Sequence, residues 1–148
     1  MAIIRDLLPV ASQRLVTIES TGAVIQAAGL LSGTGTALVV VCDTAGRMCG
    51  VITKADIVRE ISHCTGCSCT ENVSDIMTRE VISCGPDEKL VDVWAIMRAK
   101  ALKQIPIRDT DSQPLGLLYA NDALEALLKE VEYEELMLRD YVMGVGYR

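Results

Sequence analysis

The chain has 148 residues, of which 50% are apolar and 23% are charged. That composition supplies enough apolar side chains for one folded domain or two very small ones, and it excludes an intrinsically disordered chain. The formal net charge of −6 argues against nucleic acid and anionic membrane surfaces as partners, because phosphate contacts need clustered Lys and Arg. Any anionic ligand is therefore expected to be held locally, by backbone N–H groups or single basic side chains.

The longest apolar run, residues 37–42, is far shorter than the ~20 residues of a membrane-spanning helix. The N-terminus has neither the basic start nor the apolar run that is typical of a signal peptide. We therefore expect a cytoplasmic protein with no membrane partner, whose six cysteines are thiols or ligands rather than a disulfide framework.

The sequence repeats itself without a gap at an offset of 66 residues. Gly50–Asp56 (GVITKAD) falls on Gly116–Asp122 (GLLYAND), and the segment ahead of each copy, 4–8 and 73–77, also matches with three extra residues in the first copy. Two copies of so long a period indicate a duplicated domain rather than a solenoid. We predict a first domain at 1–67 with an N-terminal lead segment, the end of a Cys-containing linker at 68–72, and a second domain at 73–148.

In the first copy, a β-like run at 15–18 is followed by turn residues and a helical pattern. A β-hairpin is predicted next, with strands at 37–42 and 48–52 joined by Asp43–Gly46, and then a helix from Thr53 to about Ile61.

The second copy shows the same order, and its first helix is indicated by apolar residues at three- and four-residue spacing: Leu90, Val93, Trp94, Met97 and Ala101. Its strands are predicted at 81–84, 104–108 and 115–118, and its last helix from about Asn121. Each copy is thus a β-α-β-β-α unit whose apolar sheet face is too small to be stable alone, so the two should pack through their sheets. The predicted fold class is α/β (α+β), with tandem repeats about an approximate two-fold axis.

The chain carries two Gly-h-h-x-x-x-Asp motifs, in which h is an apolar residue, and the Ile105–Ile107 strand. With these features it resembles a CBS-domain pair, or Bateman module, over essentially its whole length. The resemblance implies a non-catalytic sensor that binds adenine-containing nucleotides in clefts between the copies, forms a homodimer, and regulates a separate partner protein. An enzyme is not expected, because no nucleophile–base pair is recognisable in the sequence.

The first candidate site is Thr53 and Asp56, where a strand ends and a helix begins. A helix N-terminus and a Thr hydroxyl suit a phosphate, and a carboxylate can accept hydrogen bonds from both ribose hydroxyls. The resemblance assigns those roles, whereas the pattern alone also fits a capping box. Neither copy has the Arg that many family members place before the Asp, and Lys54 is the nearest cation in the first copy. AMP, NAD or an uncharged adenosine derivative is therefore favoured over di- and triphosphates.

The second candidate site has Tyr119 in place of the Thr and retains Asp122 as a ribose ligand. Asn121 is predicted to take over as the N-cap and shift the start of the helix. The site could take a nucleoside or a nucleotide in another pose, or be filled by Tyr119 itself.

The adenine ring needs an apolar slot edged by backbone polar groups. The resemblance places it at Val39, Ile105 and Pro106, with Thr17 and Ser83 near the mouth. Pro106 has no N–H and should interrupt the sheet ladder there. Part of Val39 and Ile105 is also expected to be plain core.

The linker contains the only His, His63, with Cys64, Cys67 and Cys69 close behind. Three interpretations stay open: an inert linker, a redox-active dithiol, and a Cys₃His zinc site. The main alternative function is accordingly a thiol-redox or metal sensor at this cluster, and a third is a structural dimeric adaptor. The last helix runs beyond the repeat with an apolar stripe, which indicates a dimer or partner contact, or a helix folded back over its own subunit.

Overall fold

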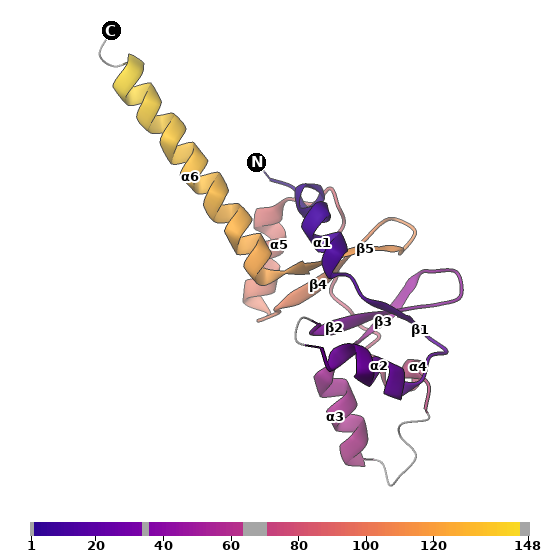
Figure 1. Cartoon of the computed structure of the whole chain (residues 1–148). Helices are drawn as coiled ribbons and strands as arrows, with labels where there is room; N and C mark the ends of the chain where they lie inside the picture. Colours follow the sequence, from indigo (N-terminus) through magenta and orange to yellow (C-terminus); the bar gives the residue numbers. More distant parts are fainter. Residues whose placement is uncertain (1, 34–35, 64–70, 146–148) are drawn as a thin grey trace.

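The computed structural model describes residues 2–33, 36–63 and 71–145, with side chains as far as Arg139 except for that of His63. The described residues form two small sheets, each flanked by helices, and Figure 1 shows one half of the molecule above the other. The predicted mixed helix-and-strand class and the two-fold repeat of the elements are confirmed. None of the described helices has the length and apolarity to cross a membrane.

The lower sheet in Figure 1 has the order β1-β2-β3. Strand β1 (Thr17–Glu19) runs parallel to β2 (Leu38–Cys42), and β2 runs antiparallel to β3 (Met48–Thr53). All five residues of β2 are buried, which explains its unbroken apolar sequence as a central strand covered on both faces. Helices α2 (Val24–Leu31) and α3 (Lys54–His63) belong to the same half.

The upper sheet has two strands, β4 (Gln104–Arg108) and β5 (Pro114–Tyr119), in an antiparallel hairpin. Helix α5 (Leu90–Ala99) precedes this hairpin and α6 (Ala120–Val145) follows it directly. Each of these elements begins 66 residues after its counterpart in the lower half, as the repeat predicts.

The strand predicted at 81–84 is largely wrong, because only an isolated parallel bridge between Cys84 and Ile107 forms there. In the first copy, the flanking ladder bonds run from the Val40 N–H to the Val16 carbonyl (2.9 Å) and from the Ser20 N–H to the Cys42 carbonyl (2.8 Å). Their counterparts at an offset of 66 are Pro106 and Pro86, neither of which has an N–H to donate. The expected interruption of the ladder at Pro106 is therefore confirmed.

The lead segments exchange places between the two halves. Helices η1 (Ile4–Leu7) and α1 (Leu8–Arg14) pack into the core of the second copy, whereas α4 (Val73–Ile76) packs into the core of the first. Figure 1 shows α1 against β5 in the upper half and α4 in the lower half, where it contacts β3 and α3. The sequence boundaries 1–67 and 73–148 thus follow the repeat, while each spatial half is completed by the other's first segment.

The glycine that opens each repeated motif is where a crossing segment passes closest to a strand. A Cβ at Gly50 would lie 2.7 Å from Met77 Sδ and 2.8 Å from the Thr78 carbonyl oxygen. A Cβ at Gly116 would lie 2.9 Å from Ala11 Cβ. The two glycines are therefore explained by close packing of backbone against strand.

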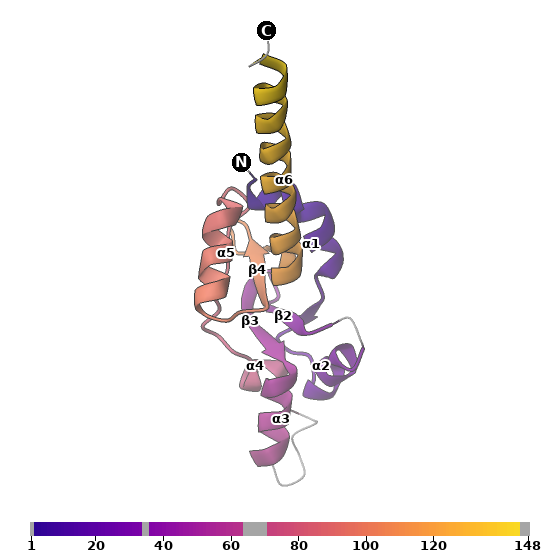
Figure 2. The same ribbon diagram turned by 90° about the vertical axis from the view of Figure 1, so that its left-hand side faces the viewer.

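The two sheets pack against each other, as predicted. Leu38, Val40 and Val51 of the first copy share a buried cluster with Leu117 of the second, and Tyr119 packs against its edge. The last helix, α6, runs out beyond this body in both views (Figure 1 and Figure 2). Helix α6 therefore does not fold back over its own subunit.

Candidate functional site

Thr53 and Asp56 form a reciprocal capping box at the start of α3. The Asp56 N–H donates to Thr53 Oγ1 (3.4 Å), while the Thr53 N–H (3.0 Å) and hydroxyl (3.2 Å) both donate to Asp56 Oδ2. The capping interpretation of this motif is thus confirmed, with Asp in the place of the usual Glu or Gln. It fixes the carboxylate at the point where strand β3 becomes helix α3.

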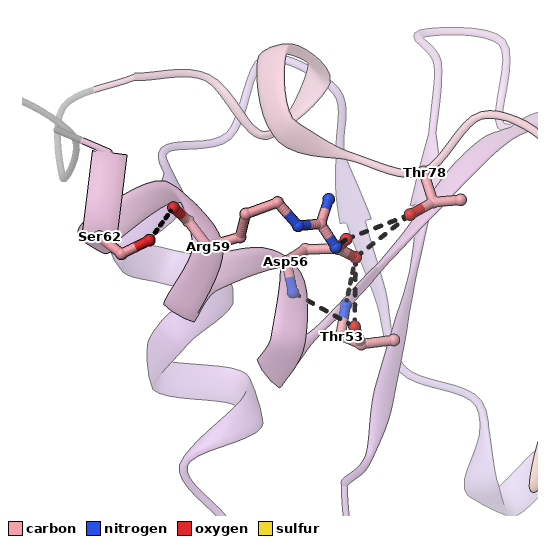
Figure 3. Close-up of polar contacts among 5 residues, drawn as sticks. All are labelled: Thr53, Asp56, Arg59, Ser62 and Thr78. Atoms are coloured by element: carbon pink, nitrogen blue, oxygen red, sulfur yellow. Dashed lines mark hydrogen bonds and ion pairs between the residues drawn. The ribbon is translucent and has the colours of Figure 1, made fainter.

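Asp56 is buried, with 4% of its surface exposed, and two further side chains donate to it. The Thr78 hydroxyl lies 3.2 Å from Oδ1 and 3.4 Å from Oδ2, and Arg59 Nη2 lies 3.2 Å from Oδ1 (Figure 3). These donors satisfy the carboxylate, which a buried charge requires. Because Thr78 belongs to the lead segment of the second copy and Asp56 to the first copy, this carboxylate ties that lead segment to the first half of the molecule.

A cleft of about 360 Å³ opens beside Thr53 and Thr78. Its volume lies within the range of about 300–1,000 Å³ that is usual for small-molecule sites. The apolar part of its lining includes Val81, Ile82 and Ile105. The full lining combines side chains from both copies: Leu38, Val51, Thr53, Thr78, Glu80, Val81, Ile82, Ala101, Leu102, Lys103, Gln104, Ile105 and Pro106.

Three of the predicted site residues, Thr53, Ile105 and Pro106, line this cleft. Asp56 is hydrogen-bonded to two of its lining residues, Thr53 and Thr78. The structure therefore brings these four predicted residues together from the two copies.

Other predicted residues lie elsewhere. Val39 is fully buried in the core of the first copy. Thr17 lines a hollow of about 410 Å³ beside the first hairpin turn, and Ser83 lines one of about 530 Å³ beside the second. Val81 and Ile82 line the cleft in place of Ser83.

Sequence reasoning missed the polar residues Thr78, Glu80, Lys103 and Gln104 in the cleft lining. The signal for Thr78 was the lead segment itself, which matches the first copy at a different offset from the rest of the repeat. That break in the register marks a separate segment, and the separate segment is the one that crosses over to Asp56.

The second copy carries a different arrangement at the matching position. Arg14, at the end of α1, donates from Nε to Asp122 Oδ2 (2.5 Å) and from Nη2 to Asp122 Oδ1 (3.1 Å). The same guanidinium lies 4.4 Å from the centre of the Tyr119 ring. The hydrogen bond to Asp122 raises the pKa of Arg14 above its ordinary value, so the guanidinium stays charged. Asp122 and Tyr119 thus gather around an arginine that the sequence did not single out.

The predicted N-cap at Asn121 is wrong. Helix α6 begins at Ala120, in the same register as α3, which makes Asn121 its second residue. The Ala120 N–H donates to the Lys103 carbonyl (2.8 Å), so the backbone at the helix start is held by the neighbouring strand segment.

Cys42, Cys49 and Cys84 are free thiols. Burial raises the pKa of Cys42 and Cys49 and, with a smaller contribution from Glu88, raises that of Cys84 to about 12. Protonated thiols are poor nucleophiles and poor metal ligands, so these three do not form a reactive centre. The linker residues Cys64, Cys67 and Cys69 lie outside the described residues.

Comparison with solved structures gives the same fold. The chain superposes on a CBS-domain containing protein from Agrobacterium tumefaciens with a TM-score of 0.70 and 24% identity, covering 84% of this chain and 98% of that one. It superposes on CBSX2 in complex with AMP with a TM-score of 0.74 and 20% identity, covering 87% and 98%. A third match is the CBS domain pair of MJ0100 in complex with 5′-methylthioadenosine and S-adenosyl-L-methionine, with a TM-score of 0.70 and 22% identity, covering 88% and 98%.

Enzymes are among the curated proteins that match part of the chain. A homoserine O-acetyltransferase from Methanohalophilus mahii is 26% identical over 85 residues, and a GMP reductase from Leishmania major is 33% identical over 89 residues. These matches cover 57% and 60% of this chain but span only 16% and 17% of the two enzymes.

The family model described as the CBS domain matches residues 4–63 and again 73–129, one match for each copy of the repeat. Since these two matches cover most of the sequence and the fold agrees with solved members, the chain belongs to the CBS domain family and is a CBS domain pair.

Proposed function

We propose that this chain is a non-catalytic regulatory module that binds an adenine-containing nucleotide, AMP- or NAD-like, in the cleft between its two copies. The observation that carries the proposal is the meeting of Thr53, Asp56 and Thr78 at the edge of a cleft whose remaining lining is mostly apolar. Polar groups at one end and an apolar slot at the other suit a nucleotide, which has a hydroxylated ribose and a flat base.

In this proposal the base lies among Ile82, Ile105 and Pro106, where the missing N–H of Pro106 leaves the sheet ladder open. The ribose hydroxyls donate to Asp56 in place of the Thr78 hydroxyl. The phosphate lies at the start of α3 near Thr53, and Lys103 in the cleft lining supplies a cation. One cation matches a monophosphate better than a triphosphate.

Two solved relatives support this class of ligand, since one is in complex with AMP and the other with 5′-methylthioadenosine and S-adenosyl-L-methionine. The regulatory role is supported by the curated enzymes, in which the matching region is a small part of a much longer chain. We propose that this module acts on a partner protein in the cytoplasm.

The occupied cleft would signal through the crossing segment. The Thr78 N–H and carbonyl pair with the Val51 carbonyl (2.8 Å) and N–H (3.0 Å), so this segment is an added edge of the first sheet. A ribose that replaces the Thr78 hydroxyl on Asp56 loosens one of the ties that hold residues 73–78 to the first copy. Ligand binding then biases the position of the second copy relative to the first.

We further propose a homodimer. Apolar side chains of α2 and α3 face solvent in the monomer, including Ile25 (60% exposed), Val58 (64%) and Ile61 (61%), and α6 has exposed apolar side chains of its own at the other end of the molecule. A second copy is the occupant that covers these helices. The thiol or metal sensor at Cys64, Cys67 and Cys69 stays a prediction from the sequence.

Calorimetric titration of AMP, NAD, ATP and adenosine into the full chain tests the proposed function. We expect AMP or NAD to bind, ATP to bind more weakly, and Thr53→Val to weaken AMP more than adenosine, since its hydroxyl is assigned to the phosphate. If none of the four ligands binds at millimolar concentration, the adenine-nucleotide proposal fails.

A further inference from the structure

Each copy has an aspartate as the third residue of its last helix, Asp56 in α3 and Asp122 in α6, yet the two carboxylates have different kinds of partner. Asp56 is held mainly by neutral hydroxyls, those of Thr53 and Thr78. Asp122 is held by a guanidinium fork, in which two different N–H groups of Arg14 each take one carboxylate oxygen. The difference follows from the sequence, since Tyr119 stands where the first copy has Thr53.

The hydroxyls in the first copy can be exchanged for those of a ligand. A Thr hydroxyl is both donor and acceptor, so after release from the carboxylate it can bond to the ligand or to water. The third partner, Arg59, makes a single contact to Asp56 with a side chain that is 63% exposed. The cleft beside these groups is open, and Thr53 and Thr78 themselves line it.

Arg14 cannot be exchanged in this way. Its fork on Asp122 is a bidentate, charge-assisted contact, which is the strongest kind of side-chain pair. Its guanidinium also lies over the Tyr119 ring, a cation–π contact that a ribose hydroxyl does not replace. The pKa of Arg14 is raised by this hydrogen bond, so no accessible pH removes its charge.

The helix that carries Arg14 is itself held in place. Ala11, one turn before Arg14, is buried against β5, where Gly116 leaves room for it. Arg14 can therefore leave Asp122 only by a change in its side-chain conformation and not by a shift of α1.

We infer that Arg14 is a built-in occupant of the second site: it takes the ribose position on Asp122, so that the native chain binds a single nucleotide, at the Asp56 site. This inference rests on the proposed function and deepens it, because it fixes the stoichiometry and names the residue that sets it. The pseudo-symmetric module is thereby made functionally asymmetric, with one ligand-responsive carboxylate and one that is locked.

Calorimetric titration of AMP into the full chain tests the inference through its stoichiometry. We expect the wild type to bind one AMP per chain, Arg14→Ala to bind two, and Arg5→Ala to bind one. Arg5→Ala is the matched control because Arg5, on the same lead segment, also donates two N–H groups to an aspartate, both to Asp87 Oδ1, but on the exposed surface. The double variant Arg14→Ala/Asp56→Ala should retain one site, the second.

Asp122→Asn in the wild-type background gives an answer that does not depend on the folding of Arg14→Ala. If Arg14 occupies Asp122, this change leaves both the stoichiometry and the affinity of the wild type as they were. Two AMP per wild-type chain, or a loss of AMP affinity in Asp122→Asn, would overturn the inference and leave the proposed function standing. A wild type that binds no AMP while Arg14→Ala binds one would retain the role of Arg14 and overturn the Asp56 site, and no binding by either would overturn both.

Discussion

Thr78, which precedes the second copy, donates its hydroxyl hydrogen to the Asp56 carboxylate of the first copy, with distances of 3.2 and 3.4 Å to the two oxygens. Thr53 reaches the same carboxylate from its own strand. Asp56, the residue proposed to bind the ribose, therefore also helps to hold together two halves that exchange their lead segments. Binding and the relative position of the two copies are coupled through one side chain, which is a physical basis for a sensor.

Asp56 is expected to be the strongest single determinant of nucleotide affinity. Asp56→Ala removes a charge-assisted acceptor worth roughly 1.5–3 kcal/mol, or about ten- to a hundredfold in Kd. Asp92→Ala is the matched control, because Asp92 is likewise the third residue of its helix, α5, but is exposed. Titration of AMP into both variants measures the effect, and equal losses in the two would remove the special role of Asp56.

The same substitution should also lower the free energy of unfolding. An exposed first-turn acid contributes about 1 kcal/mol or less, but Asp56 is buried and its loss leaves three side-chain donors without their acceptor. We expect Asp56→Ala to cost roughly 1–3 kcal/mol and Asp92→Ala to cost less than about 1 kcal/mol. Urea denaturation of both variants without ligand is the measurement, and an Asp56→Ala cost no larger than that of Asp92→Ala would contradict the structural link.

The motif glycines should resist substitution for steric reasons. Gly50→Ala places a methyl group 2.7 Å from Met77 Sδ and 2.8 Å from the Thr78 carbonyl oxygen, so the crossing segment has to move. We expect a loss of about 1–3 kcal/mol, the usual cost of overpacking, and weaker nucleotide binding because Thr78 shifts with the segment. The control is Gly29→Ala, in the middle of α2 with nothing within 4 Å, which should instead stabilise by roughly 0.5–1 kcal/mol. Thermal unfolding of both variants decides the outcome.

The element order and the hairpins could be predicted because apolar periodicity and turn residues are local signals. The short strand before Pro86 could not be judged correctly from its apolar residues alone, because the ladder there depends on N–H groups that two prolines lack. The exchange of lead segments was hidden, since a repeat alignment assigns each segment to the copy it precedes. Arg14 was missed for a related reason: its contact with Asp122 joins residues that are distant in sequence and share no motif.

The buried thiol of Cys84 should make the free energy of unfolding depend on pH in a specific way. Its pKa is raised to about 12 in the folded chain, chiefly by burial, whereas an unfolded thiol titrates near 8.5. The folded state keeps a proton that the unfolded state releases, so the contribution of this group is complete below the unfolded pKa and is lost as the pH rises above it. We expect the free energy of unfolding to fall as the pH rises from about 8.5 toward the folded pKa of about 12, and that of Cys84→Ala to fall less steeply over the same range. Parallel slopes for the two proteins in pH-resolved denaturation would rule out a buried, protonated Cys84.

The outer part of α6 is expected to carry the dimer contact. The inner turns are used within the chain, where Ala126 and Leu127 pack on the core and Glu130 accepts the Ala2 N–H (3.2 Å). From Val131 to Leu138 the apolar side chains face solvent, with Val131 59% and Leu138 64% exposed. These two lie seven residues apart and so share one face of the helix, which is the spacing of a helix–helix seam.

Light scattering on the full chain should therefore give about 32 kDa, twice the 16.0 kDa of one chain. Val131→Glu/Leu138→Glu should move the mass toward that of a monomer at micromolar concentration, because it places charges in the seam. Glu132→Gln/Glu134→Gln changes two neighbouring exposed positions on the same helix without adding charge and should leave the dimer intact. If the first variant is still a dimer, the contact is not on α6 and must be made by the exposed side chains of α2 and α3. If the wild type is a monomer, the homodimer proposal is wrong.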